Sequence, residues 1–173
     1  MTDLFEGQLI NRLKCLSCGY ETYAFDNFMD LSVEIPRKAV RFLGNINIKD
    51  CLDKFVEPEK MIDCGYKCSG CKKKVDIQKD LTIYRFPKIL VIHLKRFYNS
   101  AMRREKLNTT VQFPELLDMK KYAPHSKHRT KDAASYRLYG ISHHSGSLNG
   151  GHYIGEVYNF SNKNWYNCND SIV

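Results

Sequence analysis

Two Cys-x-x-Cys pairs constrain the fold of this chain more than any other feature of its sequence. The first pair is Cys15-Leu-Ser-Cys18 and the second is Cys68-Ser-Gly-Cys71. Two intervening residues let both sulfurs of a pair point into one coordination shell, and four thiolates make a tetrahedral zinc site. The sequence therefore predicts one Zn²⁺ held by all four cysteines. Four thiolates leave no open position for chemistry, so the predicted role is structural.

Cysteine usage in the rest of the chain favours a metal site over disulfides. The alternatives are ordinary buried cysteines or a redox pair, but two such pairs seldom occur together by accident. The total of seven cysteines is odd, and 173 residues are many for a disulfide scaffold. We therefore expect a reducing compartment, cytoplasmic, nuclear or both. Gly19 and Gly70 are expected to keep the two turns tight, and Cys64 belongs to neither pair.

Length and composition indicate a single globular domain. The chain has 173 residues, of which 43% are hydrophobic, enough for a buried core. No run approaches the roughly 18 consecutive apolar residues of a spanning helix, and the first residues lack a basic patch followed by an apolar run. We expect neither a membrane anchor nor a secretion signal. The net charge of +8 permits a nucleic acid or an acidic protein surface as partner.

One segment has the periodicity of an amphipathic helix. From Asn47 to Val56, apolar residues recur at positions 48, 51, 52, 55 and 56. Asn47 is a suitable N-cap, and Pro58 lies just beyond the expected end. The sequence therefore predicts a helix over these residues.

Most of the remaining chain has the pattern of short β-strands. The expected strands are Leu81–Phe86, Ile89–Leu94, Tyr136–Ser142 and Tyr153–Tyr158. Asn159–Asn164 has the composition of a hairpin turn, which would place Trp165–Asn169 beside the last of these strands. The polar segment Ala123–Ser135 is expected to be an exposed loop. The predicted fold class is α+β, mainly antiparallel β with a little helix.

Of the six histidines, His152 has the most informative neighbours. It follows Gly150 and Gly151 and opens an expected strand, where glycines let a ligand backbone approach closely. The predicted hairpin would bring Asn169 and Asp170 across from His152, within reach of an imidazole N–H. A histidine oriented in this way is the supporting half of a Cys-His-Asn or Cys-His-Asp catalytic group. The alternative is a histidine that merely hydrogen-bonds across a hairpin.

Several segments, taken in order, resemble the catalytic domain of the ubiquitin-specific proteases, the papain-like cysteine deubiquitinases. The similarity covers nearly the whole chain, and the ordered set is far more specific than any one segment. The matching segments are Asp3-Leu-Phe-Glu-Gly-Gln-Leu9, Cys15-Leu-Ser-Cys18, Phe86-Pro-Lys-Ile-Leu-Val-Ile-His-Leu-Lys-Arg-Phe97, Val111-Gln-Phe-Pro114, Gly150-Gly-His-Tyr153 and Trp165-Tyr-Asn-Cys-Asn-Asp170.

This resemblance implies that residues 1–173 are part of a protease catalytic domain with a hand-like fold. Zinc-bearing fingers over residues of about 10–80 would grip ubiquitin, and a palm over about 81–173 would carry the histidine. The implied catalytic residues are His152 as general base, Asn169 as its orienting residue and Asp170 as a supporting acceptor. The implied substrate-contacting residues are Gly150, Gly151 and Tyr153.

The implied reaction is hydrolysis of the isopeptide bond after the C-terminal glycine of ubiquitin. A thiolate paired with an imidazolium attacks the carbonyl, an acyl-enzyme forms, and water releases it. The terminal glycines of ubiquitin would pass through a channel too narrow for side chains, which suits Gly150 and Gly151. The implied partners are ubiquitin and ubiquitinated proteins, without a membrane.

The chain departs from the family pattern at the nucleophile. The family's box, roughly Asn-x-Gly-Asn-Thr-Cys, does not occur in this sequence, so the catalytic cysteine and most of the thumb are expected to be missing. Cys51, Cys64 and Cys168 are not well placed to replace it. We therefore expect this chain alone to be inactive. It would be a part of a larger protease domain or a natural pseudo-enzyme that binds ubiquitin without cutting.

A nucleic-acid-binding zinc ribbon is a further alternative. Several lysines accompany the second cysteine pair and could contact phosphates. They are Lys67, Lys72, Lys73, Lys74 and Lys79. A solvated lysine face explains them more simply, so we do not expect a nucleic acid partner.

Overall fold

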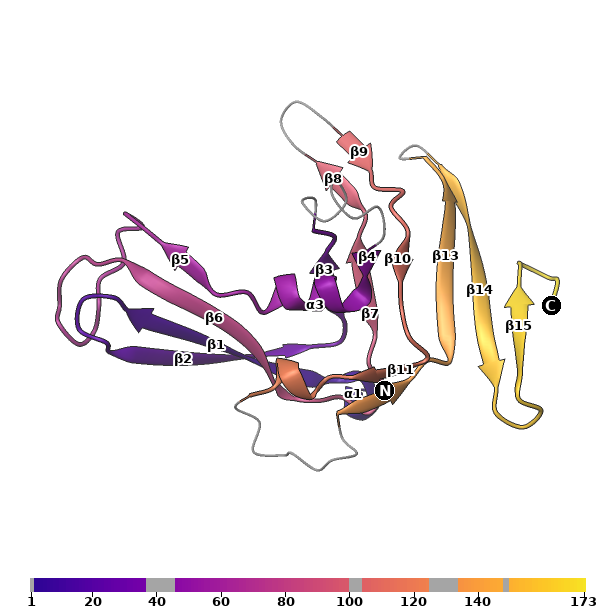
Figure 1. Cartoon of the computed structure of the whole chain (residues 1–173), viewed down its shortest axis with the longest axis horizontal. Helices are drawn as coiled ribbons and strands as arrows, with labels where there is room; N and C mark the ends of the chain where they lie inside the picture. Colours follow the sequence, from indigo (N-terminus) through magenta and orange to yellow (C-terminus); the bar gives the residue numbers. More distant parts are fainter. Residues whose placement is uncertain (1, 37–45, 100–103, 125–133, 148–149) are drawn as a thin grey trace.

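Two β-sheets lie at opposite ends of the molecule, with a core that contains helix α3 between them (Figure 1). The computed structural model describes residues 2–36, 46–99, 104–124, 134–147 and 150–173. Strands outnumber helices throughout these residues, so the fold class is α+β and mainly β, as the sequence predicts. No helix among them is both long and apolar enough to cross a membrane.

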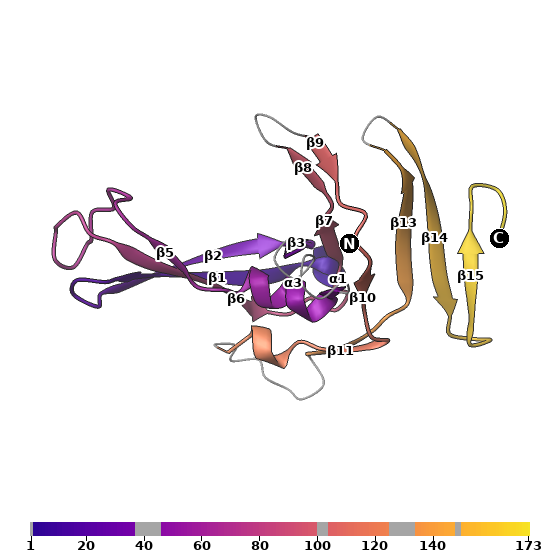
Figure 2. The same cartoon turned by 45° about the horizontal axis from the view of Figure 1, so that its top comes forward.

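A four-stranded antiparallel sheet, here called the long sheet, extends to one side of the core (Figures 1 and 2). Its strands, in spatial order, are β2 (Glu21–Phe28), β1 (Gly7–Cys15), β6 (Ile77–Arg85) and β5 (Glu59–Met61). Helix α1 (Thr2–Phe5) precedes β1. Because β1 pairs with both β2 and β6, residues that are distant in sequence meet at the outer end of this sheet.

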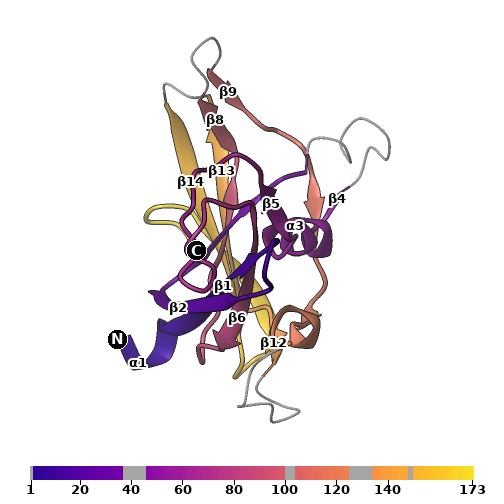
Figure 3. The ribbon, with the colours of Figure 1, turned by 90° about the vertical axis from the view of Figure 1, so that its left-hand side faces the viewer.

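The core forms around α3 (Ile48–Phe55). The side chain of Asn47 accepts a hydrogen bond from the Lys49 amide at 3.0 Å, and Asp50 accepts one from the Asn47 amide at 2.8 Å. This reciprocal pair is a capping box, and it explains why the helix begins here. Figure 3 shows α3 beside β4. The most deeply buried apolar side chains of the core are Leu31, Val33, Ile46, Leu52, Ile83 and Met119.

Short strand pairs complete the middle of the molecule. Two pairs are parallel, β3 (Leu31–Glu34) with β7 (Ile92–Lys95) and β4 (Ile46–Asn47) with β10 (Val111–Gln112). Two are antiparallel, β8 (Phe97–Asn99) with β9 (Arg104–Lys106) and β11 (Leu116–Asp118) with β12 (Ser135–Arg137). A 3₁₀ helix, η1 (Lys120–Tyr122), follows β11.

The C-terminal sheet, at the other end, has the order β13 (Gly140–Gly146), β14 (Gly151–Asn159) and β15 (Asn164–Cys168). The β14–β15 hairpin pairs Asn159 with Asn164 and Tyr158 with Trp165, which confirms the predicted turn. None of the described residues after Ala134 is fully buried. This sheet is therefore held by its backbone ladders more than by a core of its own.

The predicted helix is confirmed, with Asn47 as its N-cap, but all four predicted strands have other bounds. β6 begins at Ile77 rather than Leu81, and β14 runs from Gly151 to Asn159 rather than from Tyr153 to Tyr158. β7 begins at Ile92 rather than Ile89, because the Ile89 amide bonds to the carbonyl of Leu4 instead of joining a ladder. The expected strand Tyr136–Ser142 is two strands in different sheets. It is broken after Arg137, where the Leu138 amide bonds to the Glu115 carbonyl.

The expected loop Ala123–Ser135 is only partly described. Positions 125–133 lie outside the described residues, and both of its described alanines, Ala123 and Ala134, are buried rather than exposed. The Met119 amide donates to the Ala134 carbonyl at 2.7 Å, so this end of the segment is tied to the core. The polar average composition of the segment does not indicate that its two end alanines are buried.

Candidate functional site

Four sulfurs gather at the outer end of the long sheet. The Sγ atoms of Cys15, Cys18, Cys68 and Cys71 all lie within 4.8 Å of one another. Those of Cys18 and Cys68 are 3.7 Å apart. A tetrahedron with Zn–S bonds of about 2.3 Å separates its sulfurs by about 3.8 Å. The predicted ligands thus come together at a spacing that fits a structural Zn²⁺ and its thiolate ligands.

The two cysteine pairs fold into the same backbone turn. The Gly19 amide donates to the Cys15 carbonyl at 3.0 Å, and the Lys72 amide donates to the Cys68 carbonyl at 2.9 Å. Both donors have left-handed backbones, with φ of +73° at Gly19 and +61° at Lys72. Glycine adopts this conformation without steric cost, which confirms the prediction for Gly19. In the second turn a lysine occupies the equivalent position, which the sequence alone does not suggest.

Gly70 acts differently from the prediction. Its φ is outside the left-handed region, but a Cβ at this position would lie 2.8 Å from the Cβ of Tyr20. Gly70 therefore lets the second turn approach the residue that follows the first turn. Its amide also points at the Sγ of Cys68, 3.3 Å away, as the Cys18 amide points at the Sγ of Cys15 at 3.4 Å.

Backbone amides, burial and neighbouring thiols together give two of the sulfurs unequal acidity. The amides of Cys71 and Gly70 outweigh the effect of burial and lower the pKa of the Cys68 thiol to about 7. At Cys18 the backbone of Tyr20 also lowers the pKa, but the neighbouring thiols and burial raise it to about 11. One sulfur is therefore readily ionised at neutral pH, whereas the other needs a cation before it ionises. Metal binding with proton release suits such a set.

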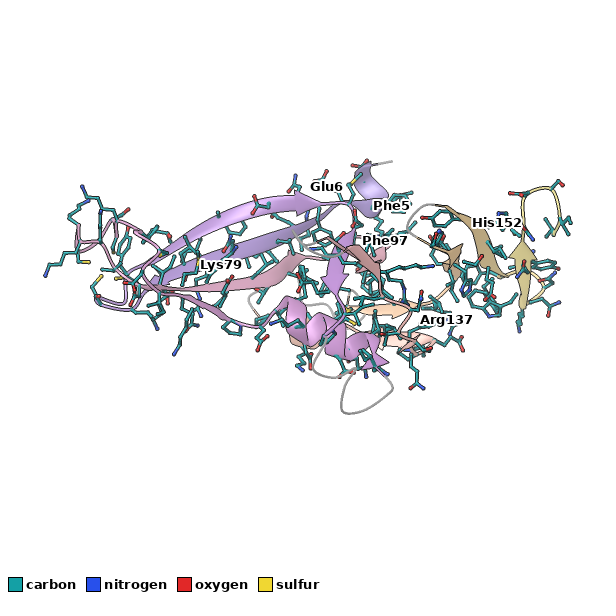
Figure 4. All side chains as sticks on the ribbon, turned by 90° about the horizontal axis from the view of Figure 1, so that it is seen from above. Phe5, Glu6, Lys79, Phe97, Arg137 and His152 are labelled. Atoms are coloured by element: carbon teal, nitrogen blue, oxygen red, sulfur yellow. The ribbon has the colours of Figure 1, made fainter. Side chains whose placement is uncertain are left out.

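His152 lies at the opposite end of the molecule from the outer tip of the long sheet (Figure 4). Its imidazole lies beside the side-chain amide of Asn169. Nε2 of His152 is 2.5 Å from Oδ1 of Asn169. An amide oxygen only accepts hydrogen bonds, so Nε2 carries the hydrogen and Nδ1 of the neutral ring keeps its lone pair. The asparagine thus sets the tautomer and the orientation of an exposed histidine.

A tight turn after β15 brings Asn169, and not Asp170, to the histidine. Asn169 and Ile172 exchange two backbone hydrogen bonds, of 2.8 and 3.0 Å. Asp170 lies in the turn between them with a φ of +52°. Within the described parts of the chain it makes no hydrogen bond to His152. No direct contact among the described residues therefore supports the predicted role of Asp170.

The sequence analysis missed His144, whose ring packs beside the predicted substrate-contacting residues. The ring centroids of His144 and Tyr153 are 4.7 Å apart. A Cβ at Gly151 would lie 2.2 Å from Nε2 of His144, so only glycine fits directly before His152. Nδ1 of His144 is buried and has no hydrogen-bond partner among the described residues. The β13–β14 register, which pairs His144 with Tyr153, would have revealed this contact.

Of the remaining candidate residues, Gly150 and Tyr153 are close to His152 along the chain, whereas the three other thiols are dispersed. Gly150 is exposed with open space around it, and Tyr153 is 62% exposed. Cys51 is buried on the core-facing side of α3, and Cys64 is exposed near the outer end of the long sheet. Cys168 is half-buried on β15. No hydrogen bond joins any of these three thiols to His152 in the described structure, so none completes a catalytic pair with it.

A β protein with a four-thiolate centre at one end and a histidine–amide pair at the other defines a narrow class. The chain belongs to the ubiquitin carboxyl-terminal hydrolase family, whose model, described as "Ubiquitin carboxyl-terminal hydrolase", matches residues 1–173. It is similar to ubiquitin carboxyl-terminal hydrolase 2 of Gallus gallus, with 42% identity over 176 residues. The human protein of the same name is 40% identical over 174 residues.

The chain spans less than half of these relatives. The alignments cover 100% of this chain but 47% of the Gallus gallus protein, and 99% of this chain but 27% of the human protein. Among solved structures it is similar to the SAGA DUB module of Ubp8, Sgf11, Sus1 and Sgf73 bound to monoubiquitin. That match has a TM-score of 0.83 and 34% identity, and covers 98% of this chain and 36% of that one. The fold is therefore that of the finger and palm regions of this family.

Proposed function

We propose that this chain supplies the ubiquitin-gripping part and the histidine–asparagine pair of a cysteine-type deubiquitinase. The reaction is hydrolysis of the isopeptide bond that follows the C-terminal glycine of ubiquitin. The observation that carries the proposal is the 2.5 Å contact between Nε2 of His152 and Oδ1 of Asn169. It leaves Nδ1 as the proton acceptor, which a thiol nucleophile requires.

In the proposed mechanism His152 is the general base and Asn169 holds its ring. Nδ1 takes the proton of a cysteine thiol, and the thiolate attacks the carbonyl carbon of the terminal glycine. The imidazolium then returns the proton to the lysine amine as the C–N bond breaks, which leaves a thioester. Water, activated by the same Nδ1, hydrolyses the thioester and regenerates the thiol. Asp170 would act only through its neighbour Asn169.

The nucleophile must come from outside this chain, because none of Cys51, Cys64 and Cys168 contacts His152. We therefore expect the chain alone to bind ubiquitin but not to cleave it. The fingers would span about residues 10–80 and the palm about 81–173, although strand β6 crosses this boundary. The four thiolates would hold Zn²⁺, which supplies structural cross-linking and no reaction step.

Two features support ubiquitin as the substrate. Tyr23 and Phe25 lie two positions apart on the edge strand β2 and are 53% and 49% exposed, an apolar surface suited to a protein partner. Gly150, Gly151 and Tyr153 lie beside His152, where the terminal glycines would pass. The similar solved structures include one bound to monoubiquitin and one bound to ubiquitin aldehyde.

The test compares two histidines in the complete polypeptide that carries this chain, with a fluorogenic C-terminal amide of ubiquitin as substrate. His152→Ala should lower kcat at least about 100-fold, because the general base is lost. His143→Ala, on the adjacent strand and paired with Glu156 at 3.4 Å, should change kcat less than about 2-fold. Equal activity of the two variants would overturn the proposal.

The 173-residue chain itself provides the second arm of this test. It should bind ubiquitin in a calorimetric titration and show no turnover. Turnover by this chain would contradict the assignment of the nucleophile to another segment. Ubiquitin binding by an inactive complete polypeptide would identify a pseudo-enzyme instead.

A further inference from the structure

Lys106, at the end of β9, joins the β8–β9 hairpin to the hairpin that carries His152. Its Nζ donates to the carbonyl of Gly146 at 2.8 Å and to the carbonyl of His144 at 3.2 Å. The two hairpins lie side by side in Figures 1 and 2. No described strand pairs with β13 on this side, so Lys106 satisfies carbonyls that a neighbouring strand would otherwise bind.

The position of these carbonyls relates Lys106 directly to the histidine. Successive carbonyls along a strand point to opposite edges, so those of His144 and Gly146 share the outer edge of β13. The residue between them, Ser145, is the cross-strand partner of His152. Lys106 therefore holds the backbone on both sides of the residue that is paired with the proposed general base.

A ring contact reinforces this connection. Phe97, at the start of β8, lies 5.8 Å from the ring of His144, measured between centroids, and the His144 ring in turn contacts Tyr153. Figure 4 shows Phe97 and His152 on these neighbouring elements. The β8–β9 hairpin thus touches both the backbone and a side chain of the His152 hairpin.

The other end of the connection is fixed to the core. Nη1 of Arg96 donates to the carbonyls of Leu107 at 3.0 Å and Thr109 at 2.7 Å. The Leu107 amide also donates to the Arg96 carbonyl at 2.7 Å. The backbone next to Lys106 is therefore anchored beside β7. Through its two hydrogen bonds, Lys106 fixes the end of β13 relative to this anchored segment.

We propose that Lys106 is a positioning residue for His152: it holds the β13–β14 hairpin so that the imidazole stays in register with Asn169. This inference rests on the proposed function where it concerns catalysis. Its structural part, the effect of Lys106 on the His152–Asn169 hydrogen bond, does not depend on whether the protein cleaves ubiquitin. Charge-assisted hydrogen bonds of this kind are about twice as strong as neutral ones.

The structural part is tested by NMR on the zinc-loaded 173-residue chain. In Lys106→Met the amides of β13 and β14 near the turn should exchange at least about 10-fold faster, because the edge carbonyls lose their partner. The imidazole ¹⁵N shifts of His152 should move towards a mixture of tautomers. Lys106→Arg, which keeps the donors, should restore both signals.

The matched control is Lys121→Met. It removes the same charge and also breaks two hydrogen bonds, both of 2.7 Å, to Asp53. It lies on η1, away from the C-terminal sheet, so the His152 shifts and the exchange near the turn should stay as in the unmodified chain. Unchanged His152 shifts in Lys106→Met, or equal changes in both variants, would overturn the inference.

The catalytic part is tested in the complete polypeptide with the same ubiquitin amide. Lys106→Met should lower kcat about 10-fold or more with little change in KM, since misplacement of a catalytic group affects the reaction step. Unchanged kcat would overturn this part. If the unmodified polypeptide does not cleave the substrate, the proposed function fails, whereas the NMR result still decides the role of Lys106.

Discussion

The two ends of the molecule achieve their geometry by different means. At the end of the long sheet, four sulfurs come from two turns with the same hydrogen-bond pattern, and two of them, Cys15 and Cys68, are buried. At the C-terminal sheet, no described residue beyond Ala134 is fully buried. A hairpin register, a short turn and contacts from the β8–β9 hairpin hold His152 against Asn169.

This difference shows which site is complete within the chain. The cysteine cluster already brings together all four ligands of the predicted metal site and needs only a cation to close. The histidine site has the proposed base in contact with the amide that would orient it, but no thiol of the described structure contacts the histidine and no fully buried residue lies in its sheet. We therefore expect the first site to govern stability and the second to govern activity, and the following experiments test that division.

Loss of the metal should have the largest effect on stability. Cys15→Ser removes a buried ligand, so the zinc content should fall from about one ion per chain towards zero. Zinc binding in such sites contributes on the order of 10 kcal/mol to folding, so the long sheet should unfold in this variant. Far-UV circular dichroism should show the loss of β-structure, and the thermal unfolding transition should disappear. Cys64→Ser is the control, because this exposed thiol lies outside the cluster and should leave the zinc content unchanged. Full zinc content in Cys15→Ser would refute the ligand set.

Truncation of one apolar side chain should have an intermediate effect on stability, and this effect should be larger in the core than in the C-terminal sheet. Leu52→Ala in α3 removes a side chain that is 1% exposed, and should cost about 2–5 kcal/mol in the free energy of unfolding. Val157→Ala in β14, where the valine is 43% exposed, should cost less than about 1 kcal/mol. Urea titration of both variants measures the difference. Similar costs would mean that the C-terminal sheet is buried in solution.

The smallest effect on stability should come from the exposed ion pair between Asp53 and Lys121. Desolvation by burial alone would raise the pKa of Asp53. Hydrogen bonds from Lys121 and Tyr122, together with the positive charge of Lys121, outweigh this effect, so the pKa of Asp53 is lowered. Because the pKa of Asp53 is lower in the folded state, its ionised form stabilises the fold at pH values above the unfolded-state pKa of about 3.9. This stabilisation is lost as the pH falls through the folded-state pKa. Asp53→Asn should therefore cost less than about 1 kcal/mol at pH 7 and nothing near pH 2, in thermal unfolding across this range. A cost that persists near pH 2 would have another cause.

The features that the sequence predicted correctly depend on local patterns. The cysteine pairs, the capping residue Asn47 and the turn at Asn159–Asn164 each lie within a few consecutive residues. Hairpin pairing then extends a local turn to the contact between His152 and Asn169. The ordered motifs of the family added the expectation of fingers and palm.

The features that the sequence did not reveal depend on pairs that are distant along the chain. The parallel pairs β3–β7 and β4–β10 have no local signature, because nothing in one strand identifies its partner. The close approach of Gly70 to Tyr20 and the hydrogen bonds of Lys106 are likewise visible only once the strands are assembled. Asp170 is the converse case, since adjacency to Asn169 did not bring it to the histidine.

The pairing of β1 with β6 also bears on how the chain reaches its native state. Cys15 stands opposite Ile77 in this ladder, so the strands meet only after the long intervening segment has closed into a loop. Non-local closure of this kind slows folding because chain entropy is lost before most contacts form. A cation captured early by the two cysteine turns would hold the loop ends together, so metal supply becomes a kinetic factor as well as a structural one.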